Sequence, residues 1–103
     1  MGNARPKPAR LAEKLRQIRL TLGISQTDML RRLGLEESMK YARISEYEIS
    51  FREPSLMTLL QYARVANVWV DVLIDDDLDL PEILPSRTKH EGIRRKAASR
   101  GKS

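Results

Sequence analysis

The strongest constraint on the fold of this chain is a pair of helical patterns separated by only three residues. The first pattern, over 9–22, places apolar side chains three and four residues apart, at Leu11, Leu15, Ile18 and Leu22. This spacing gives a helix one apolar face, and the basic residues are expected off that face: Lys14, Arg16 and Arg19. Gly23, which tolerates a positive φ, ends the helix, and Ser25 begins the next one. Two helices joined by so short a connection must turn sharply.

The second pattern begins with a capping signal. Ser25 is followed three residues later by Asp28, an arrangement in which a serine side chain and an acidic residue cap a helix N-terminus. Core candidates follow at Met29, Leu30 and Leu33, and Gly34 closes the segment. The two patterns together predict a helical hairpin with a tight turn.

A third helix is expected over 40–49, with Ser38 as its N-cap and Met39 anchoring its start. Ile44 and Tyr47, three residues apart, are expected to face inward. Polar and aromatic residues remain for the outer side of this helix: Lys40, Tyr41, Arg43, Ser45 and Glu46.

Pro54 prevents the third helix from continuing, and Ser55 caps a fourth helix over 56–66. Its apolar stripe comprises Leu56, Leu59, Leu60, Ala63 and Ala66. Asn67 ends this helix, and a short fifth helix covers 70–74. Because no segment alternates apolar and polar residues in the manner of a strand, the sequence predicts an all-α fold, a compact bundle of about five helices.

Charge is segregated along the chain, although the net value is only +5. Basic residues without acidic ones occupy 1–10, six acidic residues without a basic one occupy 71–85, and 86–103 is basic again. We therefore expect a flexible basic arm over 1–8, a folded domain over 9–85 and a disordered basic tail over 86–103. The tail is expected to reach nucleic-acid phosphates, to act only as a solubilising extension, or to lie on the acidic run.

The chain has few of the residue types that catalysis and metal binding require. The chain contains no Cys and a single His, His90, which lies in the tail. No pairing of nucleophile and base, glycine-rich phosphate loop or metal-ligand spacing occurs, so we expect neither an enzyme nor a cofactor. The longest apolar stretch, 68–73, is interrupted by Asp71, and the N-terminus lacks the apolar region of a secretory signal, so a cytoplasmic location is expected.

Three motifs follow one another in the order and spacing of a known family: Gly-Ile-Ser-Gln at 23–26, Ile-Ser-x-Tyr-Glu at 44–48 and Pro-Ser-Leu-x-x-Leu at 54–59. With them, residues 11–74 resemble the lambda-repressor/Cro (XRE-type) helix-turn-helix family. The resemblance implies a bundle of four or five helices whose third helix docks in the DNA major groove. It further implies a sequence-specific transcriptional regulator, of the repressor type, that binds a pseudo-palindrome as a homodimer at the nucleoid.

The resemblance also implies a set of DNA-binding residues: Gln26, Lys40, Tyr41, Ala42, Arg43, Ser45, Glu46 and Arg52. Arg43 is expected to pair with guanine, and Tyr41 or Ala42 to pack on a thymine methyl group. Glu46 is expected to accept a hydrogen bond from cytosine or to repel phosphates. The others are expected on phosphates, including Gln26 at the start of the second helix, where main-chain N–H groups attract anions.

Two further groups of residues follow from the resemblance. Arg19 and Glu48 match a pair that ties the first helix to the end of the third. Trp69, Val70 and Leu73 are expected either at a dimer contact or in the packing of the domain itself.

Three features depart from the family pattern. The 34–44 connection is longer than usual, so the third helix is expected to start earlier or to be tilted. Leu30 stands where Ala is usual, which implies a wider crossing of the two helices. Ser50 replaces Gly, so the third helix is expected to run on or to end differently.

An interaction module of the antitoxin or adaptor type is the alternative to a DNA-binding regulator. Such a module would hold a protein partner through 71–103, with the acidic segment 71–82 or the basic tail as its contact. The two functions are compatible, because one chain can bind both DNA and a partner.

Overall fold

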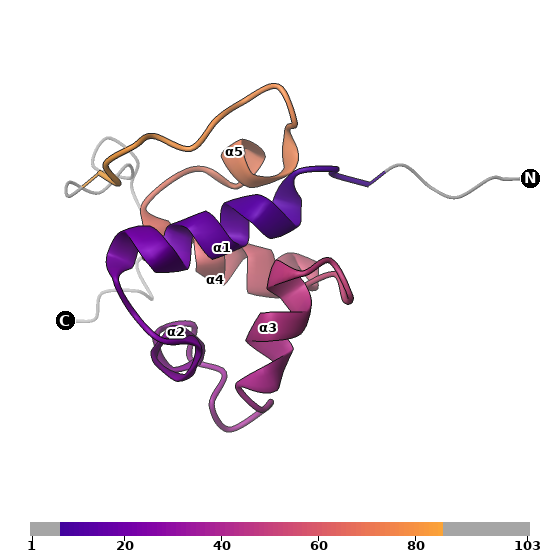
Figure 1. Ribbon diagram of the computed structural model, residues 1–103, viewed down its shortest axis with the longest axis vertical. Helices are drawn as coiled ribbons and strands as arrows, with labels where there is room; N and C mark the ends of the chain where they lie inside the picture. The colour runs from indigo at the N-terminus through magenta and orange to yellow at the C-terminus, as the bar shows by residue number, and fades with distance from the viewer. Residues whose placement is uncertain (1–6, 86–103) are drawn as a thin grey trace, which may run out of the picture.

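Serine caps begin the second and fourth helices of the domain, and left-handed residues end the first and fourth. The computed structural model describes residues 7–85, which contain five helices and no strand (Figure 1). The helices are α1 (Leu11–Leu22), α2 (Gln26–Arg32), α3 (Ala42–Glu48), α4 (Leu56–Ala66) and α5 (Val70–Ile74). The predicted all-α fold with five helices is therefore confirmed.

The caps predicted at Ser25 and Ser55 form as expected. The Ser25 side chain accepts a hydrogen bond from the Asp28 N–H at 3.0 Å, and Ser55 accepts one from Thr58 at 3.1 Å. Asn67 ends α4 with a φ of 61°. These bonds satisfy N–H groups that the first turn of a helix otherwise leaves without partners.

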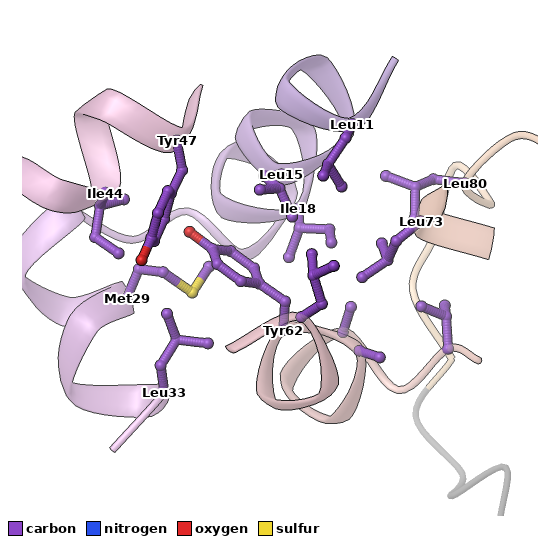
Figure 2. Close-up of a cluster of buried hydrophobic side chains, with 14 of the residues drawn as sticks. Leu11, Leu15, Ile18, Met29, Leu33, Ile44, Tyr47, Tyr62, Leu73 and Leu80 are labelled. Carbon is purple, nitrogen blue, oxygen red and sulfur yellow. The ribbon is translucent and has the colours of Figure 1, made fainter. Parts of the chain in front are cut away.

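The helices pack around α1. In Figure 1, α5 and the segment that follows it lie on one side of α1, and α2 and α3 lie on the other. Helix α1 contacts both α3 and α5, while α2 packs on α3 and α4 packs on α5. Apolar residues from all five helices meet in one core, which Figure 2 shows: Leu11, Leu15, Ile18, Met29, Leu33, Ile44, Tyr47, Tyr62 and Leu73, with Leu80 from beyond α5.

Two tyrosines fill the centre of this core. The rings of Tyr47 and Tyr62 meet edge to face, with centroids 6.5 Å apart (Figure 2). Tyr62 is fully buried, and its burial raises the pKa of the hydroxyl. Among residues 7–85 this hydroxyl has no hydrogen-bond partner, so α4 contributes its ring to the core at the cost of one unpaired polar atom.

The start of α3 corrects one prediction. The helix was expected over 40–49 with Ser38 as N-cap, but it begins at Ala42 and ends at Glu48. Ser38 instead lies in a turn, where its N–H donates to the Leu35 carbonyl at 2.9 Å. Met39, which follows Ser38, is half-buried, and its sulfur accepts a weak hydrogen bond from the Tyr47 hydroxyl at 3.8 Å.

Two side chains lie where the sequence did not place them. Leu56, expected in the stripe of α4, is 81% exposed, and Tyr62 occupies the core in its place. Lys14, expected off the apolar face of α1, is fully buried. The reason is geometric: position 14 follows Leu11 by three residues and precedes Ile18 by four, which is the spacing of the buried face itself.

The acidic segment after α5 is fastened to the start of α1. The Asp76 carboxylate accepts from the N–H groups of Ala9, at 2.9 Å, and Arg10, at 3.1 Å. The Arg10 guanidinium in turn donates to the Asp76 carbonyl at 2.9 Å and to the Asp79 carboxylate at 2.7 Å. Asp76 therefore caps α1 from the other end of the domain.

Several predictions concern the ends of the chain. The predicted basic arm, apart from Lys7 and Pro8, and the predicted basic tail lie outside the described residues. Within 7–85, no helix has the length and apolar character needed to cross a membrane.

Candidate nucleic-acid interface

Helix α3 is held by its inner face. Ile44 is fully buried and Tyr47 nearly so, and both point into the core between α1, α2 and α4 (Figure 2). Two apolar anchors three residues apart fix the rotation of a helix about its own axis. The side of α3 that carries the other residues is therefore presented outward in one orientation.

A buried ion pair fixes the far end of α3. Arg19 Nε donates to Glu48 Oε2 at 2.7 Å, and Arg19 Nη2 donates to Glu48 Oε1 at 3.0 Å. Its remaining terminal nitrogen donates to the Ile24 carbonyl at 3.1 Å. The hydrogen bonds to Glu48 raise the pKa of Arg19 against the opposing effect of burial. One guanidinium thus joins α1, the turn before α2, and the end of α3.

The outer side of α3 and of the two residues before it is open to solvent. Tyr41 is 58% exposed, Lys40 and Ala42 are exposed, and Ser45 is half-buried. No side-chain hydrogen bond or ion pair joins Lys40, Tyr41 or Ser45 to another residue of the described part of the chain. These residues form a surface that the domain does not use for its own packing.

Two arginines flank this surface and share one carboxylate. Arg43 Nε lies 3.2 Å from Glu46 Oε1, and Arg52 Nε donates to the same oxygen at 2.9 Å. All three side chains remain partly exposed. With Lys40, the group carries three positive charges and one negative charge, so the surface has a net positive charge.

The turn after α3 shows how a serine replaces the expected glycine. Helix α3 ends at Glu48, and Ser50 adopts a φ of 67° in the left-handed region. Non-glycine residues enter this region at a cost, because Cβ approaches the following carbonyl. Ile49 and Phe51 on either side are exposed, so the turn carries two apolar side chains at the edge of the interface.

The other predicted site residues lie in two places. Gln26 is the first residue of α2 and is half-buried. Trp69, 45% exposed, precedes α5, and Val70 is half-buried at its start. Of the two alternatives expected for Leu73, the dimer contact is wrong and packing within the domain holds, because its side chain is fully buried in the core.

Some polar contacts of the domain were missed in the sequence. The ion pair between Glu46 and Arg52 spans a turn, so no helical spacing indicated it, whereas Arg43 and Glu46 stand at a helical spacing of three. Within residues 7–85, no group of three or more His, Cys, Asp or Glu side chains is arranged to hold a metal ion.

Comparison with known proteins identifies one family. A family model described as helix-turn-helix matches residues 15–73, from within α1 to the core residue Leu73 in α5. The match covers more than half of the chain and includes α2, α3 and the connection between them. Neither the curated proteins nor the solved structures contain a match.

Proposed function

Because this chain belongs to the lambda-repressor-like helix-turn-helix family of DNA-binding transcription regulators, we propose that it is a sequence-specific regulator of the repressor type. In this proposal it binds double-stranded DNA in the cytoplasm, at the nucleoid, through the outer side of α3. Sequence specificity would come from side chains that contact base edges in the major groove.

The observation that carries this proposal is the contrast between the two sides of α3. Its inner side is fixed by Ile44, Tyr47 and the Arg19–Glu48 pair, while Tyr41 and Ala42 on the other side stay exposed. A major groove about 12 Å wide admits one helix that stands clear of its support. A surface held rigidly and left open is what such docking requires.

Each proposed DNA contact follows from the chemistry of its side chain. Arg43 donates to guanine O6 and N7, and Tyr41 or Ala42 packs against a thymine methyl group. Lys40 and Arg52 bind phosphates and set the register of the protein on the duplex. The remaining candidates are assigned by their position: Gln26 and Ser45 on phosphates, and Glu46 beside the bases.

We also propose that two copies bind together on a pseudo-palindrome. Trp69 and Val70 at the start of α5 are the contact residues, because Trp69 exposes a large aromatic surface there. Two recognition helices in a dimer meet successive major grooves about 34 Å apart. The half-site spacing of the bound DNA would report this distance.

Two carboxylates of the acidic segment already have partners within the domain, which weighs against the interaction-module alternative. Asp76 and Asp79 already bind Ala9 and Arg10 of the same chain. A partner that used these carboxylates would have to displace contacts within the domain. No feature of the described residues favours this alternative specifically.

Selection of bound duplexes from a random DNA pool tests the proposal directly. We expect a palindromic consensus, and then expect Arg43→Ala to weaken binding to it by about 1–3 kcal/mol while relaxing one base position. Arg64→Ala, which removes an exposed arginine from α4, is the matched control and should leave the consensus unchanged. Failure of the wild-type protein to enrich any sequence would contradict the proposed function.

A further inference from the structure

We propose that Glu46 is a positioning residue that raises the sequence selectivity of the DNA interface by holding Arg43 and Arg52 through their Nε atoms. One oxygen, Glu46 Oε1, lies 3.2 Å from Arg43 Nε and accepts from Arg52 Nε at 2.9 Å. The inference rests on the proposed function, since it concerns how the same surface distinguishes one DNA sequence from another.

Arg52 is fastened to α3 by its main chain as well as its side chain. The Glu46 carbonyl accepts from the N–H of Phe51 at 2.9 Å and from the N–H of Arg52 at 3.2 Å. The left-handed turn at Ser50 folds the chain back so that these bonds can form. Glu46 therefore holds, from both its carbonyl and its carboxylate, an arginine that lies beyond the end of the helix.

The contacts use one nitrogen of each guanidinium and leave the others available. In residues 7–85, neither Arg43 nor Arg52 has a side-chain partner besides Glu46. The two terminal nitrogens of an arginine form a fork that matches guanine O6 and N7, or two phosphate oxygens. Contact at Nε limits rotation of the guanidinium and does not use the two terminal nitrogens of that fork.

The charge of Glu46 acts on binding to unrelated sequences. Arginines without this partner would move to whichever phosphates lie nearest, and such contacts carry no sequence information. The carboxylate, which is 30% exposed, offsets one of the two arginine charges and repels phosphates that approach it. Glu46 should thus lower affinity for random DNA more than it lowers affinity for the selected site.

The test compares the full-length wild type with Glu46→Gln on the selected duplex and on a random duplex, across a range of salt concentrations. We expect the ratio of the two affinities to fall by about tenfold, which corresponds to about 1.4 kcal/mol of discrimination. On the random duplex, the salt dependence should steepen by about one unit, because about one more phosphate is neutralised. Glu82→Gln, which removes the same charge from the exposed segment after α5, is the control and should leave the ratio unchanged.

A second variant separates position from charge. Glu46→Asp keeps the negative charge but shortens the side chain by one methylene, so it should no longer reach both arginines. We expect it to lose affinity for the selected duplex and, because it keeps the negative charge, to bind random DNA more weakly than Glu46→Gln does. A purely structural role would instead lower the thermal midpoint and weaken binding to both duplexes equally, which would overturn the inference.

The outcomes distinguish the two proposals. If the wild-type protein selects a sequence but Glu46→Gln keeps the wild-type affinity ratio and salt dependence, the inference is wrong and the proposed function stands. If the wild-type protein selects no sequence, the proposed function fails first.

Discussion

Helix α1 is attached to the rest of the domain by a cation on each of two sides, and the attachments differ in what accepts the charge. Towards α3, Arg19 binds the carboxylate of Glu48. Towards α5, the fully buried Lys14 donates from Nζ to the carbonyls of Val72, at 2.8 Å, and Asp75, at 2.9 Å. The first attachment pairs opposite charges, and the second places an ammonium at the C-terminal end of a helix, where carbonyls lack partners.

Residue types can indicate the Arg19–Glu48 attachment, but they cannot indicate the attachment made by Lys14. Arg19 and Glu48 are complementary side chains at positions that match a known family. Lys14 has main-chain acceptors, and any residue at positions 72 and 75 would supply the same carbonyls. An ion pair appears in a sequence as two residues of opposite charge. A lysine that caps a helix appears as a single lysine, which cannot be told from an ordinary surface residue.

Breaking the Arg19–Glu48 ion pair should give the largest loss of stability. Arg19→Met keeps much of the apolar stem but leaves the Glu48 carboxylate buried without its partner, so we expect the free energy of unfolding to fall by about 3–5 kcal/mol. Urea denaturation measures the change. Arg16→Met, at an exposed position of the same helix, is the control, and an equal effect of the two variants would refute the role given to the pair.

Removing the hydrogen bonds of Lys14 to the end of α5 should give a smaller loss of stability. Lys14→Met retains the buried stem and removes only the donor to two carbonyls, for which we expect about 1–3 kcal/mol. Hydrogen exchange should speed up most in α5, because the helix end loses its cap. Exchange that rises equally in every helix would show that Lys14 does not act locally on α5.

The Asp76 cap should give an effect that depends on pH. Hydrogen bonds from the main-chain N–H groups of Ala9 and, to a smaller extent, Arg10 hold the pKa of Asp76 below its ordinary value. A carboxyl with a lowered folded-state pKa stabilises the fold above its unfolded pKa, and that stabilisation is lost as the pH falls through the folded value.

We therefore expect Asp76→Asn to be less stable than the wild type at neutral pH, with the difference shrinking below about pH 4. Thermal unfolding across this range measures it, with Asp77→Asn as the control. A difference that stays constant on acidification would mean that the cap does not depend on the charge.

The smallest expected effect is a gain in stability, and it comes from Ser50 in the turn that follows α3. Ser50→Gly removes the steric cost of a φ of 67°, so we expect a gain of about 0.5–1 kcal/mol. The denaturation midpoint should rise while the slope stays constant. A lower midpoint would show that the loss of chain entropy with glycine outweighs the relief at this turn.

The fold was predictable because its signals are local. Ser25 and Ser55 cap helices within three residues of themselves, and the heptad-like spacing of Leu11, Leu15 and Ile18 defines one face. The start of α3 was not predictable in the same way. Met39 was expected as an anchor, but Ser38, which has the residue type of a cap, lies in a turn with its N–H on the Leu35 carbonyl, and nothing in the residue types distinguishes that turn from a cap.

The candidate site was predictable in its residue types but not in its internal contacts. The residues around Arg43 were named from their place in the family motif, and they do line one open surface. The sharing of Glu46 between Arg43 and Arg52 depends on a turn that folds Arg52 back onto α3. The sequence left Leu73 open between the core and a dimer contact, because exposed and buried leucines look alike in so short a helix.

The enclosure of Lys14 has a practical consequence for observing this protein in solution. Its amine is shielded from reagents that modify lysines, whereas Lys40 stands open to them. Acylation of Lys14, followed by mass spectrometry over time, would therefore record how often α5 lifts from α1. The rate of Lys14 acylation would thus measure the rate of that opening.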